Sequence, residues 1–387
     1  MSTEIRSREM IERLIAFDTT SRNSNLELID SVRGYLAGFG IDSRLTHDES
    51  ETKANLYATL GPEGKSGIML SGHTDVVPVD GQDWTTDPWR IHEADGLLYG
   101  RGTSDMKSFI AIVLSYVPEM LERGLETPIH LAFSHDEEIG CVGVHGLIRD
   151  FANLPVKPYA CIVGEPTEMR VVAAHKGKRS YACHVRGHEC HSSLVHTGVN
   201  AVEVAAEIVA HMRSMARRFR DEGPHDSDYE PPYTSVHTGT IEGGTALNIV
   251  PKDCRFQFEW RFLPEHDPEA IFAEVADLAR SLEPEMQAIA PDTGISFVEL
   301  SSIAGLNTDP GEDVVALVRA LTGDNDTGKV SFGTEAGAFQ QAEIPTVVCG
   351  PGSVEQAHKP NEFIAIEQVR QCEAFMDRLL ERVCRPD

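Results

Sequence analysis

Three consecutive acids, Asp136, Glu137 and Glu138, are the residues of this 387-residue sequence whose types and spacing point most directly to chemistry. They follow an apolar run at 128–133 that predicts a short buried strand, and two nearby glycines oppose an immediate helix. We therefore expect the acids at the carboxyl end of a strand, where open α/β sheets place their ligands. Adjacent carboxylates repel, so they need a cation or a retained proton. A solvated acidic turn is the simpler interpretation of an isolated D-E-E.

Further metal-type ligands follow other predicted strands or lie in adjoining loops. They are His73, Asp105, Glu165 and His358. A lone histidine is more often structural than ligating, but five convergent positions argue against a merely solvated turn. One metal needs only three or four such groups. Together with Glu137 and Glu138 they make six groups, four of them carboxylates, which fit two metals better, with one carboxylate bridging ions about 3.5–4 Å apart.

Alternating strands and helices must position these side chains. The first part of the chain predicts helices at 7–17 and 25–39, strands at 42–46, 55–59, 67–71, 128–133 and 160–163, and a helix after Asp105 that Pro118 kinks or divides. The stretch 79–102 is expected to be irregular. After residue 303 the pattern resumes with helices at 313–321 and 366–383 and strands at 329–332 and 345–349. This order predicts an α/β fold with a mostly parallel sheet between helices.

The pattern changes between residues 179 and 302. This block predicts strands at 179–185, 234–241, 253–262 and 294–300, and helices at 200–215 and from 268. Strand, helix, strand, strand, helix, strand is the order of a ferredoxin-like α+β sandwich with one open sheet face. We expect a catalytic domain, 1–178 and 303–387, that is interrupted by an inserted domain at 179–302.

Composition limits the classes of partner. A formal net charge of −27 argues against nucleic acid and anionic membranes, both of which favour a basic surface. No segment approaches the roughly 20 apolar residues of a membrane span, and the first residues lack a signal-peptide core, so a cytoplasmic location is expected. The eight cysteines form no C-x-x-C pair, which predicts neither disulfides nor a zinc ribbon.

A series of motifs spans nearly the whole chain in order. They read S-G-H-T-D-V-V-P, G-R-G-T-S-D-M-K, D-E-E-I-G, G-E-P-T, G-H-E-C-H-S-S with G-V-N-A, G-G-T-A-L-N-I-V-P and G-P-G-S-V-E-Q-A-H-K-P-N-E. With these motifs the sequence resembles the M20 family of metallopeptidases and amidohydrolases. Within that family, F-G-T-E-A-G near Thr334 and the closing A-H-K-P-N-E-F-I are most similar to the acetylornithine deacetylases.

The resemblance implies a role for each candidate ligand. Two zinc ions are expected, although carboxylate-rich sites also accept cobalt and manganese. The implied ligands are His73 and Glu165 for one zinc, Glu138 and His358 for the other, and Asp105 as the bridge. Asp75 would orient His73, Glu137 would be the general base, and a cis peptide would follow Asp105.

The resemblance also implies substrate contacts from the inserted block. His191 could be a plain loop histidine, but the matching residue of dimeric relatives reaches the partner subunit's site and donates a hydrogen bond to the oxyanion. Arg261 could be a rim charge, but its family position favours binding of a substrate carboxylate, assisted by Asn248. The inserted block would then serve as a lid and as the interface of a homodimer.

The expected function is hydrolysis of the amide of an N-acylated amino acid, with N2-acetylornithine, an intermediate of arginine biosynthesis, as the first choice. Succinyl-diaminopimelate desuccinylase and an M20 dipeptidase or carboxypeptidase are the enzymatic alternatives. A non-catalytic metal-binding homologue is disfavoured because Glu137 and every implied ligand are present, and no cysteine cluster or dinucleotide fingerprint supports a redox or cobalt-radical enzyme. His135 has no assigned chemistry, and Asp136 is expected to be structural.

Overall fold

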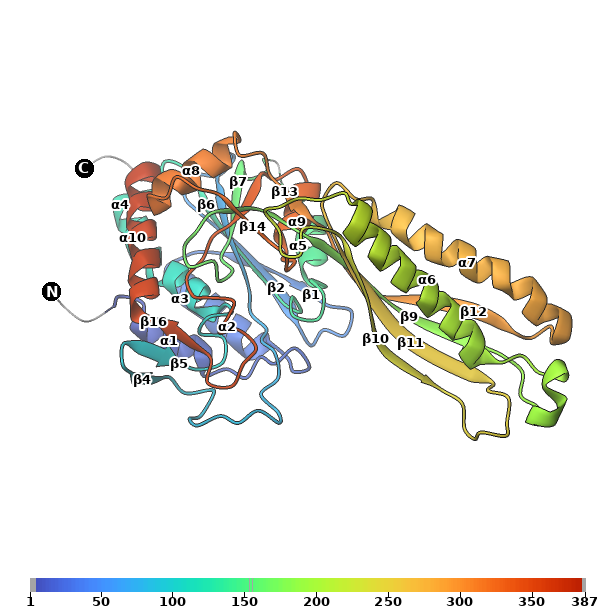
Figure 1. Ribbon diagram of the computed structural model, residues 1–387. Coiled ribbons are helices and arrows are strands. Elements are labelled where there is room, and N and C mark those ends of the chain that lie inside the picture. Colours follow the sequence, from blue (N-terminus) through green and yellow to red (C-terminus); the bar gives the residue numbers. More distant parts are fainter. Residues whose placement is uncertain (1–4, 153, 155, 385–387) are drawn as a thin grey trace. The chain divides into compact units, whose positions relative to one another are not determined.

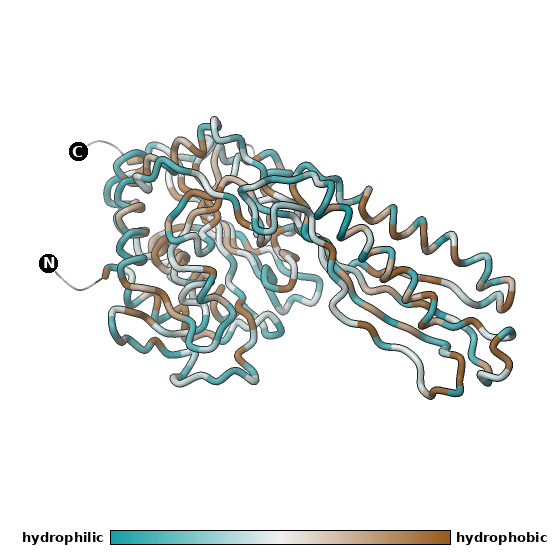
Figure 2. Tube along the Cα trace, viewed as in Figure 1, coloured by the Kyte–Doolittle hydropathy of each residue, from teal (hydrophilic) through white to brown (hydrophobic). Residues whose placement is uncertain are grey.

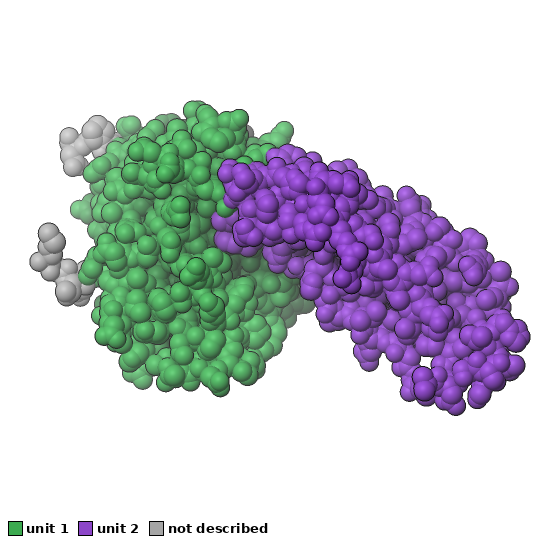
Figure 3. Space-filling view, in the orientation of Figure 1, with its two compact units in different colours: residues 1–174, 306–329, 334–387 green, residues 175–305, 330–333 purple. Residues whose placement is uncertain are grey.

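The computed structural model describes residues 5–152, 154 and 156–384. The extreme ends of the predicted catalytic domain, 1–4 and 385–387, lie outside the described residues. The chain forms two compact units (Figure 3). Unit 1 comprises residues 1–174, 306–329 and 334–387, and unit 2 comprises 175–305 and 330–333.

The sheet of unit 1 is mixed, with parallel strands at its centre (Figure 1). Its order is β1 (Ser43–His47), β2 (Ala54–Leu60), β6 (Ile129–Ser134), β3 (Ile68–His73), β7 (Ala160–Val163), β15 (Thr346–Val348), β8 (Val172–His175) and β13 (Leu306–Asn307), and β14 (Gly328–Val330) also pairs with β8. Strands β6, β3, β7 and β15 run parallel, whereas the pairs β1–β2, β2–β6 and β8–β15 are antiparallel. The predicted α/β class is confirmed, with antiparallel edges added.

Helices cover both faces of this sheet. They are α1 (Arg8–Ile15), α2 (Leu26–Gly38), α3 (Lys107–Ser115), α4 (Val117–Arg123), α5 (Val144–Phe151), α8 (Asp313–Thr322), α9 (Ala336–Gln341) and α10 (Ile366–Val383). Successive strand residues point to opposite faces. In β6, Leu131 and Phe133 belong to the core that contains α3, α8 and α10, whereas His130 lies against Tyr57, which packs on Phe151 of α5.

A small second sheet lies partly in the stretch 79–102, so the prediction of an irregular stretch was wrong at 92–94 and 97–99 and holds for the rest. It consists of β4 (His92–Ala94), β5 (Leu97–Tyr99) and β16 (Phe363–Ala365). Asp95 and Gly96 have φ of 52° and 77°, the left-handed pair of a tight hairpin turn. The D-G signal for this hairpin was present in the sequence, but its third strand comes from more than 260 residues away.

Unit 2 is a four-stranded antiparallel sheet with two long helices on one face (Figure 1). Its elements are β9 (Gly177–Arg186), the 3-10 helix η1 (Ser192–Thr197), α6 (Ala201–Glu222), β10 (Ser235–Gly243), β11 (Asp253–Phe262), α7 (Pro268–Ile289) and β12 (Gly294–Ile303), and the sheet order is β10-β11-β9-β12. Alternate residues of β11 are buried, as predicted. Hydrophobic and hydrophilic residues alternate along both helices (Figure 2), which matches helices that bury a single face.

The structure bears on the expectations for the cysteines and for membrane spans. All eight cysteines are unpaired, and every one except the half-buried Cys190 is buried. Among the described residues, the helices are too short or too polar to cross a bilayer.

His130 gives unit 1 a specific dependence on pH. Its Nδ1 lies 2.8 Å from the hydroxyl of Tyr57 and 2.9 Å from that of Thr59, and burial lowers its pKa from 6.5 to about 4. Between these two values the unfolded chain binds the proton and the folded chain does not. The free energy of unfolding therefore keeps its full value above pH 6.5 and falls by about 3 kcal/mol as the pH drops toward 4.

The His130→Phe variant should lose correspondingly less stability between pH 6.5 and pH 4 than the wild type in denaturant unfolding. His145→Phe, at an exposed position of α5, is the matched control and should follow the wild type. Equal pH slopes for the His130 variant and the wild type would contradict the assignment.

Candidate metal centre

The candidate ligands converge because three parallel strands end at one edge of the sheet. His73 is the last residue of β3, Glu137 and Glu138 follow β6, and Glu165 follows β7. Strands β6 and β7 flank β3 and run parallel to it, so their carboxyl ends meet. The predicted position of the acids at a strand end is therefore confirmed.

Asp105 lies between two imidazoles. Its Oδ1 is 2.9 Å from Nε2 of His73, and its Oδ2 is 3.3 Å from Nε2 of His358. The same nitrogen of His358 lies 2.9 Å from Oε2 of Glu138, while Glu165 Oε1 lies 3.7 Å from His73 Nε2. One carboxylate that faces two histidines with separate oxygens is the arrangement of a bridging ligand. The peptide between Asp105 and Met106 is cis, as the family resemblance implied.

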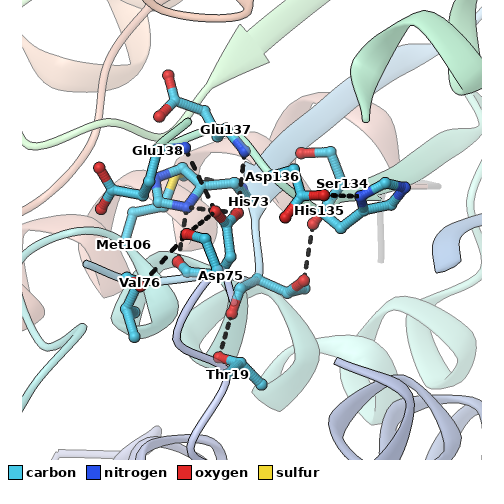
Figure 4. A network of polar contacts seen from close by, with 12 residues as sticks. Thr19, His73, Asp75, Val76, Met106, Ser134, His135, Asp136, Glu137 and Glu138 are labelled. Carbon is cyan, nitrogen blue, oxygen red and sulfur yellow. Dashed lines mark hydrogen bonds and ion pairs between the residues drawn. The ribbon is translucent and has the colours of Figure 1, made fainter. Parts of the chain in front are cut away.

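The neighbouring Asp75 orients the ring of His73, but mainly through its backbone (Figure 4). Nδ1 of His73 donates to the carbonyl oxygen of Asp75 at 2.9 Å, whereas the nearest carboxylate oxygen of Asp75 is 3.6 Å away. The carboxylate instead accepts the backbone N–H groups of Glu137 and Glu138, at 3.0 and 3.3 Å. Asp75 therefore fixes the histidine and the acid pair together.

Glu137 is placed where it could be a base or a ligand. His73, Glu137 and Glu165 each offer one ligand atom within 4.8 Å of the others, and so do His73, Asp105 and Glu138. The resemblance makes Glu137 the base, and the geometry alone also permits ligation. Metal analysis of a Glu137 variant separates the two roles.

Burial and mutual repulsion control the pKa values of the cluster. Burial raises the pKa of Glu137 and Glu165 well above the usual range, and neighbouring carboxylates add to this. Burial, with Asp105, raises the pKa of Glu138 to about 7. Burial also opposes charge on His73, but Glu165 and Asp105 outweigh it and raise the pKa of the imidazole. Such a cluster gains stability from any added positive charge.

The residues present fit divalent metal ions. Since the Nδ1 proton of His73 is directed at a carbonyl oxygen, its Nε2 lone pair faces the carboxylate of Asp105. Two electron-pair donors in this position require a cation or a second ring proton between them. Oε1 of Glu138 is buried without a hydrogen-bond partner. Imidazole and carboxylate donors suit zinc, cobalt and manganese.

A buried ion pair that sequence reasoning missed supports two of the ligands. The carboxylate of Glu362 accepts from Arg101 Nη1 at 2.5 Å and from the backbone N–H groups of Ser104 and Asp105 at 2.8 and 3.0 Å. Oε1 of Gln82 accepts a hydrogen bond from Nη2 of Arg101 at 2.7 Å. Nε2 of Gln82 donates to the carbonyl oxygen of His358 at 2.9 Å. The pair therefore links the loops that carry Asp105 and His358. The N-E pair of the final motif was noted only as a family marker.

Replacing Glu362 with Gln should lower the free energy of unfolding by about 3 kcal/mol, because it leaves Arg101 as an uncompensated buried charge. Both side chains are 1% exposed. Denaturant unfolding in a chelator measures this effect without the metal contribution. Glu381→Gln, on the exposed side of α10, is the matched control and should change stability by less than about 0.5 kcal/mol. A similarly small change in Glu362→Gln would contradict the role of the pair.

Glu335 is a second buried acid that the sequence did not assign. Its Oε2 accepts from the hydroxyl of Ser134 at 2.9 Å, and burial raises its pKa to about 7. It belongs to F-G-T-E-A-G, which served only as a marker of the subfamily. An acid inside an otherwise small and apolar motif was the signal available for it.

In unit 2, the loops that carry His191 and Asn248 lie side by side. Ser192 N–H donates to the carbonyl oxygen of Asn248 at 3.0 Å, and His191 forms a bridge with Ile249. The His191 side chain is exposed, and its Nδ1 accepts from the N–H of Ser193. His191 and Asn248 both lie beyond Asp253, the first residue of β11.

Arg261 lies at the opposite end of the same strand. Arg261 is paired with Lys178, and Asp253 with Arg186 at the other end of the register. Eight residues of strand, at about 3.3 Å each, place these ends about 26 Å apart. Arg261 and Asn248 of one chain therefore cannot contact the same small substrate, and Arg261 instead donates to Glu259 at 3.2 Å.

The α/β sheet with ligands at its strand ends and the buried carboxylate–histidine cluster define a metallohydrolase. Residues 69–382 match the model of peptidase family M20/M25/M40, and the chain belongs to this family.

Named relatives and solved structures are similar to nearly the full length of the chain. The chain is 34% identical over 386 residues to an acetylornithine deacetylase of Myxococcus xanthus and 33% identical over 386 residues to that of Pasteurella multocida (strain Pm70), with 97% of each chain covered in both cases. Among solved structures, its fold is similar to the M20 family metallo-carboxypeptidase Sso-CP2 from Sulfolobus solfataricus, with a TM-score of 0.76 at 18% identity over 98% of this chain and 99% of the other.

Proposed function

We propose that this protein is a metal-dependent amidohydrolase that removes the acyl group of an N-acylated amino acid, with N2-acetylornithine as the first candidate substrate. The carrying observation is the position of Asp105 between His73 and His358 with Glu137 beside the cluster. The acetylornithine deacetylases that match nearly the full length of the chain support the choice of substrate.

His73 and Glu165 would hold one zinc ion, Glu138 and His358 the other, and Asp105 would be shared. When bound, the two ions lower the pKa of a water molecule and polarise the amide carbonyl. Glu137 accepts a proton from the attacking water and delivers it to the nitrogen of the leaving amine. The products are the free carboxylate of the acyl group and the amino acid.

Recognition of the substrate is assigned to residues of unit 2. The guanidinium of Arg261 suits bidentate binding of a carboxylate. His191 would donate a hydrogen bond to the developing oxyanion, with Asn248 beside it. Because Asn248 lies beyond Asp253, and Asp253 is about 26 Å along β11 from Arg261, we assign His191 and Asn248 to the site of a partner subunit in a homodimer. A cytoplasmic location is also part of the proposal.

A substrate panel with purified, metal-loaded protein tests this function. It should contain N2-acetylornithine, succinyl-diaminopimelate and a set of dipeptides, with kcat/KM measured for each. Fastest turnover of acetylornithine is the expected result. Fast cleavage of dipeptides without turnover of any N-acyl amino acid would overturn it, and no turnover with metal bound would indicate a non-catalytic homologue.

A further inference from the structure

The third acid of D-E-E, Asp136, remains outside the proposed metal centre. It is not a member of either group of candidate metal ligands among the described residues. Its Oδ1 forms an ion pair with the ammonium of Lys53, and its Oδ2 lies 3.1 Å from Nδ1 of His135. The ion pair is shielded, since the side chains of Lys53 and Asp136 are only 13% and 10% exposed. The ammonium of Lys53 thus compensates the negative charge of Asp136.

The backbone at Asp136 makes this contact important for the neighbouring residues. Asp136 has a φ of 56°, in the left-handed region that residues other than glycine adopt uncommonly, with asparagine and aspartate as the most frequent exceptions. A residue held there depends on surrounding contacts to keep it in place. The chain reverses at this point, and the carbonyl oxygen of Asp136 accepts from the N–H of Val142 at 3.0 Å. The next peptide groups are those of Glu137 and Glu138.

Lys53 also contacts Ser21, which is linked to the acid pair Glu137 and Glu138 through Asp75. Its ammonium donates to the carbonyl oxygen of Ser21, whose hydroxyl donates to Asp75 Oδ2 at 2.7 Å. Asp75 in turn accepts the N–H groups of Glu137 and Glu138. The contacts therefore form a closed ring that runs from Lys53 through Asp136 to the acid pair and returns through Asp75 and Ser21.

We propose that Lys53 is a positioning residue that holds Glu137 in its reactive orientation through this ring. Lys53 directly precedes β2, which pairs with β1 on one side and with β6 on the other, so its backbone adjoins the sheet. The contacts of its ammonium are to Ser21 and Asp136, and neither of these residues is a proposed metal ligand. Loss of its charge frees the left-handed turn at Asp136 and the Ser21 segment at the same time. A misplacement of about 1 Å at a reacting group can cost 100-fold in rate.

The test uses the full-length, metal-loaded protein with Lys53→Met, Lys53→Arg and Asp136→Asn. Asparagine tolerates the left-handed backbone and removes only the charge. Lys53→Met and Asp136→Asn should each lower kcat about 10–100-fold with KM within about twofold and metal content unchanged. Lys53→Arg should recover most of the loss, and the double variant Lys53→Met/Asp136→Asn should be no worse than either single variant. The exposed ion pair Lys157–Glu343 is the matched control, and Lys157→Met should leave kcat unchanged.

Because Glu137 is the base only if the chain hydrolyses amides as proposed above, a second readout is independent of turnover. Amide hydrogen exchange of the peptide covering 134–143 should be at least tenfold faster in Lys53→Met than in the wild type, with exchange elsewhere in unit 1 unchanged. Faster exchange in that segment without activity of the wild type toward any substrate would remove the proposed function and retain the ring. Unchanged exchange, or a kcat within twofold of the wild type, would overturn the role of Lys53, and general unfolding of both single variants would reassign it to stability.

Discussion

Glu137→Gln should lower kcat by about 10²–10⁴-fold while the protein keeps its metal content. Glutamine preserves the size of the side chain but cannot accept the proton of the attacking water, and general acid–base catalysis contributes factors of this size. Burial, helped by Glu138, raises the pKa of Glu137, and bound cations would lower this pKa again, so that the carboxylate is ionised and able to accept a proton. The measurements are kcat and KM with the best substrate, together with metal analysis of the purified protein.

Glu63→Gln, in an exposed turn, is the control and should behave as the wild type. An unchanged rate in Glu137→Gln would refute its role as base. Loss of one metal equivalent would make Glu137 a ligand, in line with its place beside His73 and Glu165.

Asp105→Ala should weaken metal binding at least 100-fold and remove activity. Changes to groups that merely support ligands cost 10–100-fold in affinity, and Asp105 contacts His73 and His358 directly. The expected loss covers both ions because one carboxylate is shared between the two histidines. Calorimetric titration of chelator-treated protein with Zn²⁺ measures the affinity and the stoichiometry.

Asp42→Ala, at an exposed position before β1, is the matched control and should bind metal with the same affinity and stoichiometry as the wild type. Two tight sites in Asp105→Ala would contradict the bridging role. Loss of only one site would assign Asp105 to a single ion.

The position of D-E-E was predictable because its signals are local. An apolar run followed by glycines places a strand and its end within a few residues, and the parallel centre of the sheet brings the ends of β3, β6 and β7 together. The bridge at Asp105, by contrast, came from resemblance to a family and not from spacing.

The supporting contacts were not predictable, for a physical reason. Lys53 and Asp136 are 83 residues apart, and Arg101 and Glu362 are 261 apart. Periodicity reports which face of an element is buried, but it does not report which charged side chain meets which partner. A lysine in a polar segment before a strand is the same signal whether it is solvated or paired.

The separation of Arg261 from Asn248 could be predicted from the sequence alone. The strand at 253–262 was predicted with the observed bounds, and its length alone implies a span well beyond a small substrate. The alternation of residues predicts the two faces of that strand, whereas the separation of its ends follows from its length.

Strands β8 and β13 are adjacent in the sheet of unit 1, and most of unit 2 lies between them in the sequence. Thr308 N–H donates to the carbonyl oxygen of Ala173 at 2.9 Å, so the chain leaves unit 1 and returns to it at adjacent positions of one sheet. Genetically, unit 2 corresponds to a cassette between residues 174 and 306, with the short segment 330–333 as its only other part. A chain with a plain turn in place of residues 175–305 would still contain every metal ligand proposed here. On the proposed assignment of substrate contacts to unit 2, exchange of this cassette would change the substrate range and leave the proposed metal ligands of unit 1 in place.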